Sequence, residues 1–215
     1  MFDLDGTLTD PGEGITKCVQ YALDAIGKPE PDAKRLYSFI GPPLLEQFMD
    51  YCKIGRKEAE FAVKKYRERF RDKGIYENVL YDGVEEMLKA LKAAGKTLTV
   101  ATSKPEVFAS RILKHFQIEG YFELIVGSGL DGTRTKKAEV IEEIIRQLSL
   151  PREERKSCLM IGDRFHDIEG GRLAGVSTMG VTFGYGGREE LVACRADYVV
   201  DSWKELLSIA APVFG

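Results

Sequence analysis

The sequence lacks the features that mark membrane, secreted and nucleic-acid-binding proteins. No apolar run approaches the length that spans a bilayer, and Asp3 and Asp5 interrupt the start of the chain, where a signal peptide would need an apolar core. The 31 lysines and arginines are balanced by 34 aspartates and glutamates, so no basic patch dominates. We therefore expect a cytoplasmic protein with neither a membrane nor a nucleic acid as its partner.

Cysteine is also scarce. The four cysteines are widely separated, and none belongs to a Cys-x-x-Cys pair: Cys18, Cys52, Cys158 and Cys194. This pattern predicts reduced thiols and argues against a zinc site or a disulfide framework. The 215 residues, 44% of them hydrophobic, suffice for one large domain or for a core domain with a smaller insertion.

The stretch MFDLDGTLTD opens the sequence, and two of its carboxylates, Asp3 and Asp5, stand two residues apart just before Gly6. Residues i and i+2 of a strand point to one side, and glycine permits a sharp turn. Both carboxylates should therefore leave the carboxyl end of a strand over 1–5, where α/β sheets bind ligands. Such close like charges need a cation or a shared proton, and oxygen ligands suit Mg²⁺. The alternative is an ordinary strand followed by an Asp-Gly turn.

The apolar pattern divides the rest of the chain into two kinds of structure. Residues 13–82 show helical patterns only, with breaks at Pro29, Pro31 and Gly41-Pro42-Pro43. From Gly83, helices alternate with short apolar strands, expected at 97–101, 124–126, 157–161, 177–181 and 198–200. This alternation predicts a parallel, three-layered α/β core over 1–12 and 83–215, with a small helical domain inserted at 13–82. The strand expected over 1–5 is short, which is compatible with a sequence that begins inside a longer strand.

Three further groups follow strands or begin helices, at the expected ligand-binding edge. Thr102, with the adjacent Ser103, precedes a helix whose N-terminus suits a phosphate oxygen; alternatively, Ser103 only caps that helix. Lys137 begins a helix despite the unfavourable helix dipole, which suggests a role in neutralising a phosphoryl group; Lys136 is the rival. Asp163 and Asp167 follow a hydrophobic strand and can complete a magnesium site begun by Asp3, unless they lie in a simple surface loop.

In this order, FDLDGTL, Thr102, Lys137 and GDRFHD resemble the four signatures of the haloacid dehalogenase (HAD) superfamily. The resemblance covers nearly the whole chain. It implies a three-layered Rossmann-like core with an inserted, small, all-helical cap domain. Segments such as FIGPPL, VATSKPEVFASRIL and GYGGREEL are similar to a 5′-nucleotidase-like or phosphoglycolate-phosphatase-like branch. One departure is Ala138 after Lys137, where many relatives have proline.

The resemblance also implies roles for individual residues. Asp3 is expected to be the nucleophile, Asp5 the general acid/base, and Thr102 and Lys137 the phosphate holders. The expected magnesium ligands are Asp3, Asp5 through its carbonyl, Asp163 and Asp167. The expected substrate-binding residues are Gly6, Thr102, Ser103 and Lys137, joined by Gly41 and Pro42 of the insertion, although Gly41-Pro42-Pro43 could equally be a helix stop.

The implied activity is magnesium-dependent hydrolysis of a small phosphorylated metabolite through a phospho-aspartate. The first candidate substrate is a nucleoside 5′-monophosphate and the second is phosphoglycolate. An acid at Asp5 argues against a dehalogenase, because an expelled halide needs no proton. A sugar phosphomutase and a non-catalytic phosphate-binding protein remain alternatives, and the protein is expected to be a monomer or a homodimer.

Overall fold

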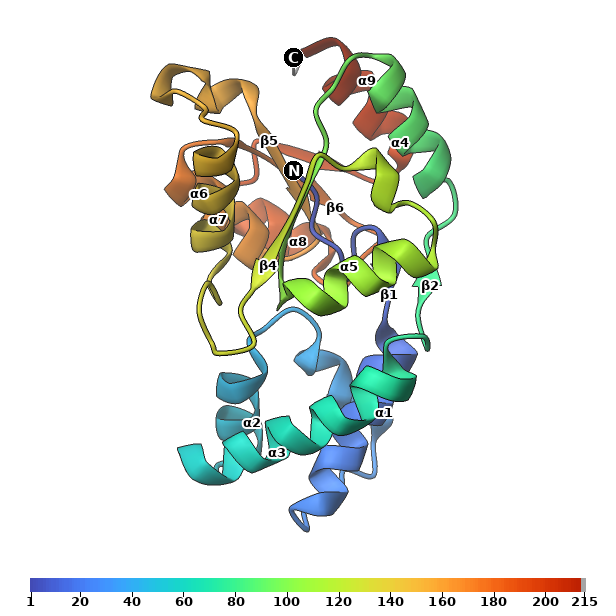
Figure 1. The fold of residues 1–215 in the computed structure, drawn as a ribbon, viewed down its shortest axis with the longest axis vertical. Helices are drawn as coiled ribbons and strands as arrows, with labels where there is room; N and C mark the ends of the chain where they lie inside the picture. Colours follow the sequence, from blue (N-terminus) through green and yellow to red (C-terminus); the bar gives the residue numbers. More distant parts are fainter. Residues whose placement is uncertain (214–215) are drawn as a thin grey trace. The chain divides into compact units, whose positions relative to one another are not determined.

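The computed structural model describes residues 1–213 and divides into two compact units (Figure 1). One unit is built from Met1–Thr9 and the chain from Leu80 onward, and the other is Asp10–Val79. The chain passes between the units through two short strands, β1 (Thr9–Asp10) and β2 (Val79–Leu80), which pair with each other. These strands were not predicted, because two residues are too few to show a periodic pattern.

The first unit contains a sheet of parallel strands. Its pairs are β3 (Thr99–Pro105) with β4 (Leu124–Ser128), β5 (Leu159–Gly162) with β6 (Ser177–Val181), and β6 with β7 (Tyr198–Val200). Phe2 joins the two groups, because it forms parallel bridges to Val100 of β3 and Ile161 of β5. The core is thus a parallel α/β sheet, as the sequence predicted.

The N-terminal segment differs from the predicted strand over 1–5. Its only bridge to β3 and β5 within the described residues is at Phe2, whose N–H donates to Thr99 O at 2.8 Å. The chain turns immediately afterwards, since the N–H groups of Leu8 and Thr9 both donate to Leu4 O. This early turn ends the pairing before a strand is formed.

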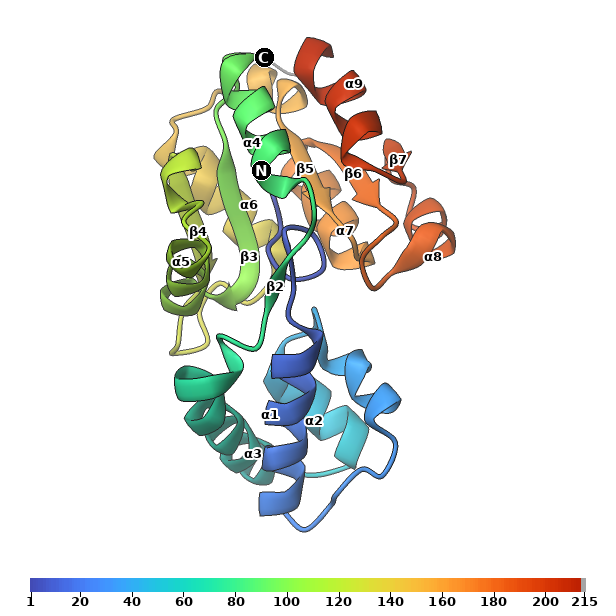
Figure 2. The same cartoon turned by 90° about the vertical axis from the view of Figure 1, so that its right-hand side faces the viewer.

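Helices cover both faces of the sheet. Helices α4 (Val84–Ala93) and α9 (Trp203–Val213) lie on one face, and α6 (Lys137–Gln147) and α7 (Phe165–Ala174) on the other (Figures 1 and 2). Helix α5 (Glu106–His115) packs on β3 and β4, and α8 (Gly187–Ala193) packs on β6. The buried stripe of α6 packs on the sheet through residues that the sequence pattern singled out: Val140, Ile141, Ile144 and Ile145.

Several boundaries in this unit differ from the prediction, and one helix was not predicted. Strand β3 continues through residues 102–105, which were expected to form a turn. Strand β5 begins only at Leu159, after a 3₁₀ turn over Arg152–Ser157. Helix α7 begins at Phe165, so Asp167 lies in its first turn and not in a loop. Helix α8 was missed, because a seven-residue helix that starts at a glycine has a weak signal.

The second unit is helical. It contains α1 (Gly12–Ala25), α2 (Leu44–Cys52) and α3 (Arg56–Arg69), with a 3₁₀ turn over Ala33–Phe39 and a π-helical turn over Phe70–Gly74. Its buried side chains come from all of these elements and include Val19, Phe39, Phe48, Tyr66 and Phe70. Within the described residues of the whole chain, we find no helix with the length and apolarity needed to cross a bilayer.

Candidate active site

Three carboxylates meet in the first unit. Asp3, Asp163 and Asp167 are all buried, and each offers an oxygen that lies within 4.8 Å of the others. Asp3 follows the bridging residue Phe2, Asp163 follows β5, and Asp167 lies in the first turn of α7. Parallel pairing puts these positions at one end of the sheet, so residues 160 positions apart in the chain converge.

Asp163 is fixed by groups from two loops. The Thr7 hydroxyl donates to Asp163 Oδ1 at 3.2 Å, and the Tyr185 N–H donates to Asp163 Oδ2 at 2.7 Å. Gly6 has φ of +78°, and a Cβ there would lie 2.3 Å from Asp163 Oδ2. Gly6 therefore serves both the turn and the close approach of Asp163 to the first loop.

Lys137 connects two of the carboxylates. Its Nζ lies 2.8 Å from both Asp3 Oδ1 and Asp167 Oδ1, and it donates to Ala101 O at 2.9 Å. Burial lowers the pKa of this ammonium, but the Asp167 and Asp3 carboxylates outweigh burial and raise it. Lys136, the rival in the sequence, is exposed at the N-cap of α6. The lysine that meets Asp3 is thus Lys137.

Asp5 lies outside the three-carboxylate group and has a lysine of its own. Its Oδ2 is 2.8 Å from Lys104 Nζ, and the two side chains are only 12% and 6% exposed. Burial raises the pKa of Asp5, while Lys104 opposes the rise. Sequence reasoning missed Lys104, because a lysine in an expected turn is normally solvated. The available signal was its place in the TSKP segment, two residues after Thr102.

Thr102 is buried in the middle of β3, just after the regularly paired residues 99–101, and its hydroxyl accepts the N–H of Lys104 at 3.2 Å. The expectation that Thr102 and Ser103 stand at a helix N-terminus was wrong. Helix α5 has Pro105 as its N-cap, with no side-chain hydrogen bond, because β3 continues past residue 102. Gly41 and Pro42 belong to the helical unit and precede α2.

The charge balance of the group fits a divalent cation. The four carboxylates, Asp3, Asp5, Asp163 and Asp167, outnumber the two lysines by two charges. Burial, followed by repulsion from Asp167 and Asp3, raises the pKa of Asp163 well above its usual range. Three buried carboxylate oxygens at this spacing are hard ligands of the kind that Mg²⁺ prefers. The residues present therefore fit such an ion.

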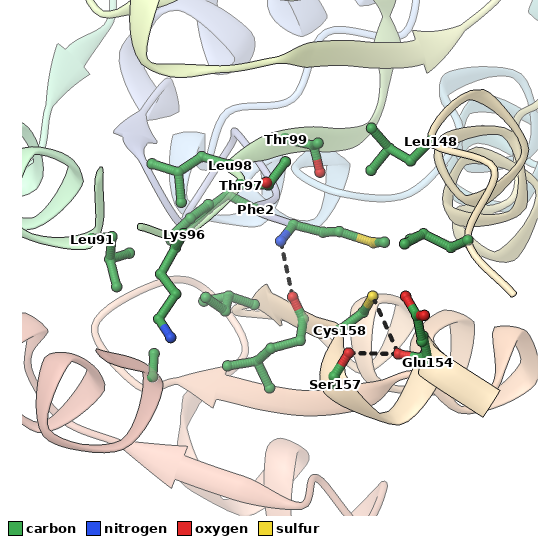
Figure 3. Close-up of a pocket in the computed structure, with 15 residues that line it drawn as sticks. Phe2, Leu91, Lys96, Thr97, Leu98, Thr99, Leu148, Glu154, Ser157 and Cys158 are labelled. Carbon is green, nitrogen blue, oxygen red and sulfur yellow. Dashed lines mark hydrogen bonds between the residues drawn. The ribbon is translucent and has the colours of Figure 1, made fainter. Parts of the chain in front are cut away.

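A separate cavity lies elsewhere in the first unit (Figure 3). Its wall includes residues 97–99, before and at the start of β3, and Leu159, the first residue of β5. It therefore lies at the amino ends of these strands, opposite the carboxylates. None of the residues that line it belongs to the acidic group or its lysines.

Comparisons with known proteins agree with this geometry. A family model described as haloacid dehalogenase-like hydrolase matches residues 1–181. A 5′-nucleotidase of Pseudomonas aeruginosa is 52% identical over 193 residues, covering 90% of this chain and 86% of that protein. The tyrosine-protein kinase PtkA of Mycobacterium tuberculosis is 39% identical over 213 residues, covering 99% and 69%. The crystal structure of a predicted phosphatase from Clostridium acetobutylicum superposes with a TM-score of 0.91 at 43% identity, covering 97% of each chain.

Proposed function

The chain belongs to the haloacid dehalogenase-like hydrolase family and is a phosphatase, and on that basis we propose that it hydrolyses phosphate monoesters through phosphorylation of Asp3. The observation that carries the proposal is the buried contact of Lys137 Nζ with Asp3 Oδ1, within a group of three carboxylates. A buried carboxylate beside a fixed cation is suited to attack an anionic phosphoryl group.

In this proposal Asp3, Asp163 and Asp167, together with the backbone carbonyl of Asp5, would hold Mg²⁺. Such an ion would supply positive charge that neutralises the phosphoryl group. Lys137 keeps Asp3 in place and adds positive charge, while Thr102 contributes a hydroxyl from β3. Gly6, which lies against Asp163, and Ser103, which follows Thr102 in β3, complete the proposed phosphate-binding residues.

The chemistry of the carboxylates follows from their separate partners. Asp3 attacks phosphorus, the bond to the leaving oxygen breaks, and Asp5 donates a proton to that oxygen. Water then attacks the phosphorus of phospho-Asp3, Asp5 takes its proton, and inorganic phosphate leaves. Lys137 pairs with Asp3 and Lys104 with Asp5, so nucleophile and acid/base are held independently.

We propose a nucleoside 5′-monophosphate as the first candidate substrate, supported by the name of the Pseudomonas aeruginosa relative, and phosphoglycolate as the second. The helical unit, Asp10–Val79, would act as the cap that selects between substrates, with Gly41 and Pro42 at its substrate-binding loop. The four cysteines, all within the described residues, form no disulfide, which is in keeping with the cytoplasm as the proposed compartment.

A phosphate-release assay on purified protein tests the proposal directly. The panel includes nucleoside monophosphates, phosphoglycolate and sugar phosphates, each with Mg²⁺ and with EDTA. We expect the release of inorganic phosphate to require Mg²⁺. We also expect Pro42→Ala to change the relative activity on the different substrates. Interconversion of sugar phosphates without phosphate release would favour a mutase, and binding without turnover would favour a phosphate-binding protein.

A further inference from the structure

We propose that Lys104 is a positioning residue for Asp5, holding one carboxylate oxygen so that the other exchanges protons with the leaving group and with water. The inference rests on the proposed function, in which Asp5 is the general acid/base. It concerns a lysine that lies outside the three-carboxylate group and its partner Lys137.

The ion pair is unusually well buried for a lysine. Lys104 Nζ lies 2.8 Å from Asp5 Oδ2, with only 6% of the lysine side chain and 12% of the aspartate side chain exposed. Lysine is almost never so buried without a partner, and removal of two charges from water is costly unless their geometry is good. A buried pair beside a reactive carboxylate therefore suggests a functional constraint.

Both ends of the pair are attached to ordered backbone. The N–H of Lys104 donates to the Thr102 hydroxyl at 3.2 Å, where β3 departs from its regular register with β4. Asp5 forms a bridge with Thr9, and the N–H of Gly6 donates to Thr9 O at 2.8 Å. These local bonds restrict where the two side chains can go, so the pair has a defined geometry.

The two oxygens of Asp5 have different surroundings. Oδ2 meets Lys104, whereas Oδ1 is buried and has no hydrogen-bond partner among the described residues. A buried oxygen without a partner is costly until a donor arrives. Since Lys137 Nζ is already engaged by Asp3, Asp167 and Ala101 O, Lys104 is suited to hold Asp5.

The proton balance follows from this arrangement. In the first step the proton on Asp5 Oδ1 passes to the leaving oxygen as its bond to phosphorus breaks. In the second step a water proton passes to Oδ1 as the water oxygen bonds to phosphorus and the bond from phosphorus to Asp3 breaks. Lys104 keeps its proton throughout and touches neither the substrate nor the phosphoryl group.

Leaving-group dependence tests this role. We expect Lys104→Met to lower kcat/KM for an alkyl phosphate by roughly 10²-fold, the lower end of what acid catalysis contributes. An aryl phosphate that leaves as a stabilised phenolate should change little, because its oxygen needs no proton. The parameter kcat/KM is chosen because it covers the steps up to phosphoenzyme formation.

A double-mutant cycle separates positioning from phosphate binding. In an Asp5→Asn background, Lys104→Met should cause no further loss on the alkyl phosphate, because the two residues act as one unit. Lys104→Arg should retain part of the leaving-group profile that Lys104→Met loses. Lys114 is an exposed lysine of α5, and Lys114→Met serves as the control. Thermal unfolding of each variant confirms that the site is compared in folded protein.

The possible outcomes are distinct. Equal losses on both substrates, or a loss that persists with Asp5→Asn, would overturn the inference and indicate that Lys104 binds phosphate. Unchanged rates on both substrates would overturn it too. If the wild type releases no phosphate, or if Asp5→Asn has wild-type activity on alkyl phosphates, the proposed function itself fails.

Discussion

At the scale of single residues, the helical unit contains an ion pair whose contribution depends on pH. Arg69 Nη1 and Nη2 donate to the two carboxylate oxygens of Glu77 at 2.6 and 3.0 Å, and Lys17 Nζ lies 3.3 Å from the same carboxylate. The hydrogen bonds from Arg69 lower the pKa of Glu77 below its usual value, against the effect of burial. The ionised form of Glu77 is therefore favoured by folding.

We predict that Glu77→Gln lowers the free energy of unfolding by about 0.5–1 kcal/mol at pH 7. Because the pKa of Glu77 is lower in the folded state, this stabilisation is complete above the unfolded value of about 4.3 and is lost as the pH falls through the folded pKa. Urea unfolding of both proteins between pH 7 and pH 3 measures the difference.

The matched control is Glu60→Gln, which removes an exposed ion pair with Arg56 one helical turn away. The side chains of that pair are more than half exposed, so its loss should have a smaller effect. A difference between Glu77→Gln and the wild type that stays constant down to pH 3 would contradict the assignment.

The residues of the candidate site were predictable to different degrees. Asp3, Asp163 and Asp167 could be named because carboxylates that follow apolar strands meet at one edge of a parallel sheet. The choice between Lys136 and Lys137 depends on where α6 begins. Lys136 is the N-cap of α6 and Lys137 is its first residue, and a sequence pattern does not fix this boundary. Lys104 could not be found, because its partner depends on β3 continuing past Thr102.

At the scale of secondary-structure elements, α1 and the π-helical turn over Phe70–Gly74 approach each other closely in the helical unit. The Gly14 N–H donates to Glu77 O at 2.9 Å. A Cβ on Gly14 would lie 2.1 Å from Gly74 O and 2.6 Å from Glu77 O. The two backbones therefore meet where only glycine fits.

We predict that Gly14→Ala destabilises the protein by about 1–3 kcal/mol, the usual cost of overpacking, although alanine is intrinsically the better helix former. Gly120→Ala should change stability by no more than about 0.5 kcal/mol, since nothing lies within 4 Å of a Cβ there. Chemical denaturation of both variants gives the comparison. Equal stability of Gly14→Ala and the wild type would contradict the tight contact.

The elements that sequence patterns predicted are those with a sustained period. Helix α2 and strands β6 and β7 begin and end where the pattern indicated. Residues 13–82 showed helical patterns only, but α3 ends at Arg69 and a π-helical turn follows. The close contact with Gly14 accompanies that turn, and it depends on tertiary packing, which a local pattern cannot reveal.

At the scale of the whole molecule, the acidic group joins the N-terminal segment to residues far along the chain. Asp3 meets Asp163 and Asp167 there, and Lys137 Nζ lies 2.8 Å from both Asp3 and Asp167. An ion held by all three carboxylates would bind the folded chain and not the unfolded one. Mg²⁺ should therefore stabilise the fold by mass action.

We predict that MgCl₂ at a hundred times its dissociation constant stabilises the wild type by roughly 2.7 kcal/mol, seen as a rise in Tm that EDTA reverses. Asp163→Asn should lose this rise, whereas Lys114→Met should retain it. The measurement needs no substrate, so it tests the ion separately from activity. A Tm that Mg²⁺ leaves unchanged in the wild type would count against a magnesium site.

The overall organisation could be predicted because the α/β and helical patterns follow one another in the sequence in the same order as the parts of the fold. One α/β pattern, interrupted once by a helical block, indicated a core with an insertion at 13–82, whereas the two compact units divide at residues 9–10 and 79–80. The substrate could not be predicted in the same way. The choice of substrate depends on the arrangement of a few side chains, and a periodic sequence pattern does not reveal that arrangement.

The most direct test of the account is detection of the phosphorylated enzyme. Wild-type protein is mixed with a nucleoside monophosphate and Mg²⁺, quenched in acid within the first turnover, and analysed by mass spectrometry. We predict one added phosphoryl group on the peptide that contains Asp3, which disappears as inorganic phosphate forms and is absent from Asp3→Asn. Turnover without a phosphorylated enzyme, or turnover by folded Asp3→Asn, would contradict the phospho-aspartate mechanism.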